Sequence, residues 1–220
     1  MVWHEGVAGR ATEEASNSYW QFLLTNWNKK HITIFADNCV GQNKYWTLLS
    51  MLMKAVHSAQ LALQILTLKF FEPGHTSMSA DSVHRGINRQ LGKRSVFDFE
   101  DHVRAVEAAN IRCVEPQSFL QMEDGISRQK LAKLSQTDER PYLAQMKVVQ
   151  FRRDDERLFV KYSHKEQPWK AYRIFKQPFD ATESPETLNA STATDEDKIQ
   201  EILSTLAPYM PRHKKHLGKT

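Results

Sequence analysis

Asp37 follows directly after an apolar run, and two carboxamides and a glycine come close behind it. Residues 32–43 read ITIFADNCVGQN. The apolar residues 32–36 are rich in β-formers and predict a short buried strand. Polar groups at the carboxyl end of a buried parallel strand are where open α/β sheets bind their ligands. Asp37 is therefore the first candidate for chemistry.

A second polar segment, residues 72–81, reads EPGHTSMSAD and follows a strand-like run at 65–71. Between the two runs, residues 42–60 repeat apolar positions at helical spacing. Strand, helix and strand with short connections predict a βαβ unit, whose strands are parallel. Parallel strands share a carboxyl edge, so Asp37 and the segment 72–81 are predicted on one side. Two acids at one edge are what a divalent-metal site needs.

The remaining elements follow from periodicity, capping residues and turn signals. We predict helices over 13–28, 79–91, 97–110 and around 199–206, and an antiparallel meander of strands over 146–151, 157–162 and 169–175. The pattern as a whole predicts an α/β fold.

Composition shifts along the chain predict four regions. They are a core fragment over 1–112, a helical segment plus β-meander subdomain over 113–178, an acidic linker over 179–196, and a C-terminal helix with a basic tail over 197–220. The linker is rich in Thr, Ser, Glu and Ala, and carries no apolar periodicity.

The bulk composition permits one sizeable core. The chain has 220 residues, of which 40% are hydrophobic, and a formal net charge of +4. A mildly basic balance permits a polyanionic partner. The two cysteines lie in different predicted elements without metal-ligand spacing, so we expect a reduced, intracellular protein that is not secreted. No run approaches the roughly 18 apolar residues of a membrane span.

Four segments carry a family resemblance. They are residues 3–10 (WHEGVAGR) running into Glu14 and Ser16, the string DNCxGQN over 37–43, Gly74-His75-Thr76 with Asp81, and the closing region 203–211. In these segments the chain resembles the transposase-derived domains found in many arthropod genomes, which are similar to the RNase H-like, acidic-triad superfamily. The resemblance implies a truncated RNase H-like core, a mixed sheet flanked by helices, with a small antiparallel β appendage.

The same resemblance implies a DDE-type transposase or nuclease site. Similar folds cut or join phosphodiester bonds with two Mg²⁺ or Mn²⁺ ions. Asp37 would bridge the metals, and Asp81 and Glu14 would supply further ligands. His75 would steer the attacking water or hold the scissile phosphate.

Each of these residues also has an ordinary structural explanation. Asp37 would end its strand in an Asx turn, and Asp81 would belong to a capping box begun by Ser79. Glu14 would interact with the helix dipole, and His75 would bond to loop backbone. Both interpretations stay open at this point.

Two further sets of residues are candidates for nucleic-acid contacts, through carboxamides or through cations at roughly one-turn spacing. The sets are Asn38, Gln42 and Asn43, and Arg85, Arg89, Lys93 and Arg94. The alternatives are helix capping for the first set and a solvated helix face for the second. The basic meander contains Trp169 and Tyr172, which would either stack single-stranded bases or fill the sheet's own core.

Three hypotheses about function follow. The superfamily carries its first catalytic Asp on an upstream strand, and we expect this chain to begin after that strand. The chain is then a metal-dependent enzyme acting on DNA, a non-catalytic nucleic-acid-binding remnant, or a relic. DNA is the expected partner, with RNA as the alternative and no membrane. The basic tail 212–216 suggests a nuclear location, with the cytoplasm as the alternative.

Overall fold

The structure is a computed structural model, and it describes residues in most of the predicted helices and strands. It covers residues 12–39, 43–72, 79–109, 141–165, 167–175, 197, 200, 201, 204, 205 and 208–212, with 79 and 80 described in backbone only. The chain divides into two compact units: a sheet unit (10–76 and 118–188) and a helical unit (1–9, 77–117 and 189–220). The predicted regions 1–112 and 113–178 each contribute to both units, and their boundaries stay a prediction.

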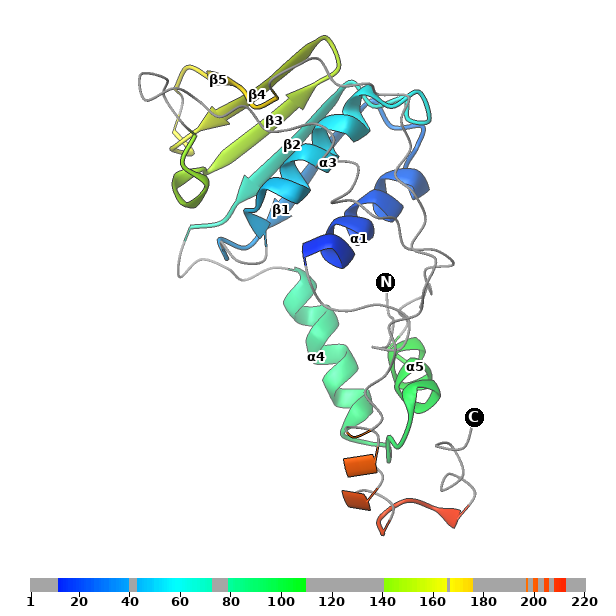
Figure 1. The fold of residues 1–220 in the computed structure, drawn as a ribbon. Helices are drawn as coiled ribbons and strands as arrows, with labels where there is room; N and C mark the ends of the chain where they lie inside the picture. Colours follow the sequence, from blue (N-terminus) through cyan, green and yellow to red (C-terminus); the bar gives the residue numbers. More distant parts are fainter. Residues whose placement is uncertain are drawn as a thin grey trace. The chain divides into compact units, whose positions relative to one another are not determined.

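The sheet unit contains a five-stranded mixed sheet in the order β1-β2-β3-β4-β5 (Figure 1). Its strands are β1 (His31–Ala36), β2 (Ile65–Phe70), β3 (Val148–Arg152), β4 (Asp155–Lys161) and β5 (Lys170–Arg173). The pair β1–β2 is parallel, with Ala36 opposite Phe70. The other three pairs are antiparallel. The predicted α/β class and the predicted parallel pair are therefore confirmed.

The predicted antiparallel meander is confirmed as β3, β4 and β5, and it belongs to the same sheet as β1 and β2 instead of forming an appendage. Its first strand, β3, pairs with β2, placing Phe151 opposite Leu66 and Val149 opposite Leu68. The backbone N–H and C=O groups on the outer side of β2 need partners, and β3 supplies them. The register also keeps the apolar side chains of both strands on one face. The meander thus extends the sheet of β1 and β2.

Two helices of the sheet unit lie on one side of the sheet (Figure 1). Helix α3 (Trp46–His57) packs on β2 and β3, and α1 (Thr12–Thr25) packs on α3. Helix α3 begins later than its predicted start at residue 42. Tyr45, in extended conformation, is its N-cap residue. The apolar stripe therefore marked the helix correctly, but Lys44 and Tyr45, directly before it, are not helical.

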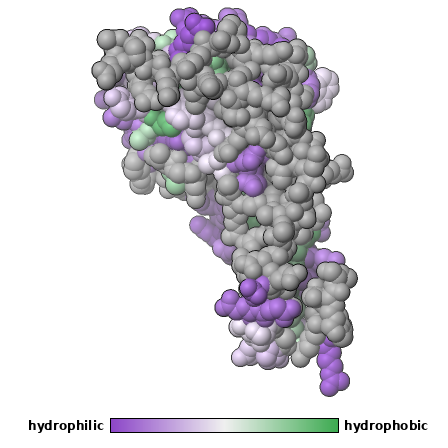
Figure 2. All heavy atoms as spheres, in the orientation of Figure 1, coloured by the Kyte–Doolittle hydropathy of each residue, from purple (hydrophilic) through white to green (hydrophobic). Residues whose placement is uncertain are grey.

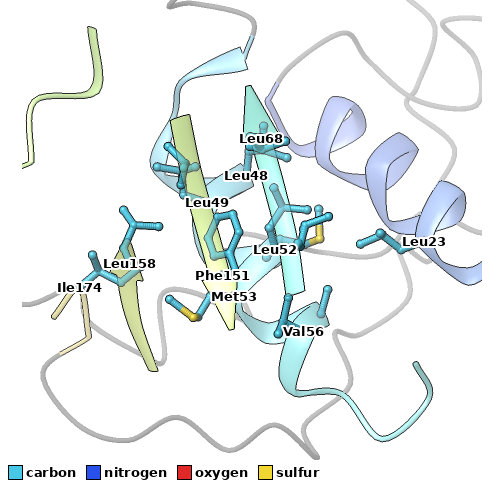
Figure 3. Close-up of a cluster of buried hydrophobic side chains, with 14 of the residues drawn as sticks. Leu23, Leu48, Leu49, Leu52, Met53, Val56, Leu68, Phe151, Leu158 and Ile174 are labelled. Carbon is cyan, nitrogen blue, oxygen red and sulfur yellow. The ribbon is translucent and has the colours of Figure 1, made fainter. Parts of the chain in front are cut away.

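The core lies between α3 and the sheet (Figure 3). Leu48 and Leu52 of α3 are fully buried, as are Leu68 of β2 and Leu158 of β4. Phe151 of β3 is buried between them, as Figure 3 shows. The strand residues follow the period of two and the helix residues the period of three and four that a shared core requires.

Arg153 joins the end of β3 to the connection between α3 and β2. Its Nη2 donates to the carbonyl oxygens of Ser58 at 2.9 Å and Leu61 at 2.6 Å, and its Nε donates to that of Leu63 at 2.7 Å. A planar guanidinium can meet several acceptors in one plane, which an ammonium cannot. Arg153 therefore holds two segments together that are about ninety residues apart in the chain.

The helical unit contains α4 (Ser79–Leu91) and α5 (Phe99–Glu107), which pack on each other. Asp98 caps α5 by accepting a hydrogen bond from the backbone N–H of Asp101 at 2.7 Å. The described positions of the predicted final helix are helical. The predicted linker 179–196 lies outside the described residues.

The described surface is mostly hydrophilic on the face drawn in Figure 2, with small hydrophobic areas between the polar ones. Of the helices described, none has the length and apolarity needed to cross a bilayer.

Candidate functional site

Asp37 follows the last residue of β1, next to the parallel strand β2. The backbone N–H of Phe71 donates to the carbonyl oxygen of Ala36 at 3.0 Å, so the ladder between the two strands continues to this point. Asp37 and Glu72 therefore leave the sheet at one edge, as predicted. The half-buried Asp37 carboxylate accepts from the backbone N–H of Cys39 at 3.1 Å. This is the Asx turn that the sequence left open.

A chain of side-chain hydrogen bonds orients Asp37. The Nδ2 of Asn43 donates to Oδ1 of Asp37, and the Oδ1 of Asn43 accepts from the hydroxyl of Tyr19 at 3.2 Å. Both ends of the Asn43 carboxamide are engaged, so its orientation is set. Asn43 does not cap α3, where Tyr45 is the N-cap residue. Its amide serves Asp37 instead.

Helix α1 contributes a second group of polar residues beside this chain. Ser16, which is fully buried, lies with its Oγ 3.3 Å from the Tyr45 hydroxyl. The charge of Glu14 contributes to the raised pKa of Tyr45. We call these residues together the polar cluster: Glu14, Ser16, Tyr19, Asp37, Asn43 and Tyr45. The cluster brings two of the predicted acids, Glu14 and Asp37, to the same end of the sheet unit.

The two tyrosines of the polar cluster are neutral hydroxyl groups. Burial raises the pKa of Tyr19 to about 12, and electrostatic interactions with Tyr45 and Asp37 act in the same direction. Burial is also the main cause of the raised pKa of Tyr45. Neutral phenols donate hydrogen bonds, and the Tyr19 phenol does so toward Asn43. The polar cluster thus combines the carboxylates of Glu14 and Asp37 with the neutral hydroxyl groups of two tyrosines.

Lys44 is a buried cation that sequence reasoning missed. The residue is only 2% exposed, and its Nζ donates to Oδ1 of Asn38 and to the carbonyl oxygens of Ala144 at 3.2 Å and Met146 at 2.8 Å. Burial, with a smaller contribution from Lys147, lowers its pKa to about 8. The sequence offered one sign that this lysine is buried, namely its place at the start of an apolar helical stripe. It gave no sign of the carbonyl oxygens that accept from the ammonium, because they belong to a distant segment of the chain.

Lys44 links the loop after β1 to the 3-10 helix η1 (Leu143–Gln145) that precedes β3. Its Nζ also lies 4.6 Å from the centroid of the Phe70 ring at the end of β2. Asn38 is engaged by this ammonium, so its side chain supports the loop. The predicted contact of Asn38 with nucleic acid stays a prediction.

The other predicted site residues lie elsewhere in the chain. Asp81 is an exposed residue in the first turn of α4, in the helical unit, and its convergence with Asp37 stays a prediction. His75 and Gln42 lie outside the described residues. The predicted basic residues of the helical unit are all exposed. They are Arg85, Arg89, Lys93 and Arg94.

The residues of the polar cluster meet part of what a divalent cation needs. Carboxylate oxygen is the ligand that Mg²⁺ and Mn²⁺ prefer, and Mg²⁺ often takes one or two carboxylates together with substrate phosphate. Asp37 fits this chemistry as an oriented carboxylate. Within the described ranges, however, no group of three or more His, Cys, Asp or Glu side chains is placed to hold a metal ion. The described residues thus offer an open, incomplete ligand set.

Comparisons with protein-family models, curated proteins and solved structures found no match to this chain.

Proposed function

We propose that this chain is a transposase-derived, RNase H-like module that acts on DNA phosphodiesters with Mg²⁺ or Mn²⁺. The observation that carries the proposal is the oriented carboxylate of Asp37 at the carboxyl end of β1, beside a parallel strand. Ligands of open α/β sheets bind at this edge. The mixed sheet with helices on one face is compatible with a truncated RNase H-like core.

Within this proposal four residues of the polar cluster have a stated task. Asp37 is the principal metal ligand, and Glu14 and Asp81 are the candidates for further ligands. Asn43 and Tyr19 hold the Asp37 carboxylate in place. When bound, the cation would supply charge neutralisation and an activated water to phosphodiester cleavage.

The proposal predicts that nicking of supercoiled DNA requires both the cation and Asp37. The wild-type chain should nick plasmid in Mg²⁺ or Mn²⁺ and lose this activity in EDTA. Asp37→Asn preserves the shape of the side chain but removes the charge that holds the ion. We expect at least a ~100-fold loss, on the scale of removing one strong electrostatic contribution to catalysis.

Asp154→Asn is the matched control, because Asp154 is an exposed acid in the turn between β3 and β4 of the same unit. It should nick like the wild type. Equal nicking by Asp37→Asn and the wild type would refute the assignment of Asp37. Circular dichroism of both variants separates loss of activity from loss of fold.

A non-catalytic, nucleic-acid-binding module is the second candidate. The absence of a three-acid group within the described ranges favours it, as does the exposed basic side of α4. Arg85 and Arg89 are one turn apart there, and Lys93 follows. Phosphate contacts of this kind make affinity fall steeply with salt.

The two candidates differ in one measurement. If the chain only binds, duplex DNA affinity persists in EDTA and in Asp37→Asn, with no nicking under any condition. Replacing Arg89 by Gln should then reduce the slope of log K against log salt by about 0.9, the value for one phosphate contact.

A further inference from the structure

The side of the sheet opposite α3, which we call the open face, carries an unusual row of residues. Thr33, Thr67, Gln150 and Phe159 are register partners across β1 to β4. Gln150 donates from Nε2 to the Thr67 hydroxyl at 3.1 Å, so the row is held by a cross-strand hydrogen bond. The row places three polar side chains beside the aromatic ring of Phe159, and of these residues Thr67 and Phe159 are buried.

A second row lies next to the first and alternates rings, aliphatic groups and cations. Phe35, Lys69, Val148 and Lys161 are register partners across the same four strands. Phe35 is 56% exposed, although it belongs to a strand, and Lys69 beside it is exposed too. A large aromatic side chain that is exposed on a strand and flanked by cations indicates a surface that binds a ligand or partner.

The cations of the open face contact aromatic rings. Lys69 Nζ lies 5.7 Å from the Phe35 centroid, and Lys161 Nζ lies 4.7 Å from that of Trp169. The Arg152 guanidinium lies 3.8 Å from the Phe159 centroid, and its Nε also donates to Gln150 at 2.7 Å. Within the described residues, no ion pair includes any of these three cations. The charges of Lys69 and Lys161 are therefore available to an anion, whereas the charge of Arg152 also acts on Asp155, whose carboxyl pKa it helps to lower.

A cavity of about 680 Å³ opens between the two rows. Its lining combines Thr33, Thr67 and Gln150 with Lys69, Lys161 and Trp169, and it also includes one acid, Glu72. At one end, the Phe35 and Phe71 rings lie 5.9 Å apart in a tilted arrangement. Hydrogen-bonding groups at the floor, cations along the sides and rings at the ends suit a planar, polar group attached to a phosphate.

We propose that the open face binds single-stranded DNA, with bases stacked on Phe35 and Trp169 and phosphates near Lys69, Lys161 and Arg152. Aromatic side chains and a basic groove are the general requirements for binding single strands without sequence preference. A duplex hides the faces of its bases, so it cannot use the exposed rings. The choice of DNA over RNA rests on the proposed function, whereas the single-strand preference rests on the open face alone.

The binding test uses the whole chain, a fluorescent single-stranded oligonucleotide and anisotropy in EDTA. EDTA removes the proposed nicking from the measurement, so this inference and the proposed function can fail separately. We expect the single strand to bind at least ~10-fold more tightly than the duplex of the same sequence. Phe35→Ala and Trp169→Ala should each weaken binding about 5- to 150-fold, the range for losing one stacked base.

A separate variant tests the charge. Lys69→Gln should reduce the slope of log K against log salt by about 0.7, the value for one phosphate contact on a single strand. Matched controls are Trp27→Ala and Lys29→Gln, which replace an exposed ring and an exposed cation after α1. Both controls should bind like the wild type, and Phe35 and Lys69 are exposed enough for their variants to fold.

An oligonucleotide without bases separates stacking from charge. It keeps the phosphates, so equal affinity for it would overturn the stacking assignment. Unchanged affinity in Phe35→Ala, Trp169→Ala and Lys69→Gln would overturn the location. Tighter binding of RNA than of DNA would refute the choice of DNA, and equally strong competition by poly-glutamate would show that the face binds acidic peptides instead.

Discussion

Lys44 provides the sharpest test of the structure, because its charge state and its hydrogen bonds are coupled. Lys44→Met keeps most of the length of the side chain and removes the ammonium. Two opposite effects follow at neutral pH. The carbonyl oxygens of Ala144 and Met146 lose a charged donor, which costs about 1–3 kcal/mol for a buried acceptor. The variant is also relieved of burying an ammonium, which is unfavourable.

The pH dependence separates these effects. Burial lowers the pKa of Lys44 from 10.5 to about 8 in the folded chain. Between these values the unfolded chain binds a proton that the folded chain does not, so the free energy of unfolding rises with pH. Integrated from pH 7 to 9.5, this difference in proton binding raises the free energy of unfolding by at most about 2 kcal/mol. The value is an upper bound because water that reaches the ammonium reduces the shift of its pKa.

The assay is urea unfolding followed by tryptophan fluorescence at several pH values from 7 to 9.5. The wild type minus Lys44→Met difference should change in favour of the wild type as pH rises, because other titrating groups cancel in it. Lys29→Met, at an exposed lysine, should follow the wild type. Parallel curves for the wild type and Lys44→Met would show that Lys44 keeps an ordinary pKa and refute its burial.

Three other perturbations test the fold. Arg153→Met should cost about 2–4 kcal/mol in urea unfolding because three carbonyl oxygens lose one charged donor, and Arg153→Lys should recover only part of it. Leu52→Ala should cost about 2–5 kcal/mol, whereas Phe22→Ala, 46% exposed, should stay within about 0.5 kcal/mol. Burial, then the hydrogen bond with Tyr172, raises the pKa of Tyr162 to about 12. The unfolded tyrosine ionises near 10, so thermal stability should fall between pH 10 and 12, and less so in Tyr162→Phe.

The local pattern of apolar and polar residues was sufficient to predict most of the helices and strands. The strand predicted at 32–36 is β1 with one more residue, and the helix predicted to follow a Ser79 cap and to run to about residue 91 is α4. Short-range periodicity reports which side of an element is buried, and that depends little on the partner. The parallel pairing of β1 and β2 also followed, because a short helical connection leaves few other arrangements.

The candidate site was predicted in part. The position of Asp37 at a strand end followed from the sequence, since a buried run and a polar loop are adjacent in the chain. The support of Asp37 by Asn43 and Tyr19 did not follow, because Tyr19 belongs to an apolar stripe and looked like core. Its ring does pack against the core, while its hydroxyl reaches the loop.

The sequence by itself determined the elements, the first parallel pair and the place of Asp37, because each depends on residues close together in the chain. Only the tertiary structure decided that β3 extends the sheet, that Lys44 is buried, and that Phe35, Lys69 and Lys161 share a row. Those features depend on hydrogen bonds between segments about eighty to one hundred residues apart. Register across such a distance is set by packing of the whole sheet, which no local period encodes.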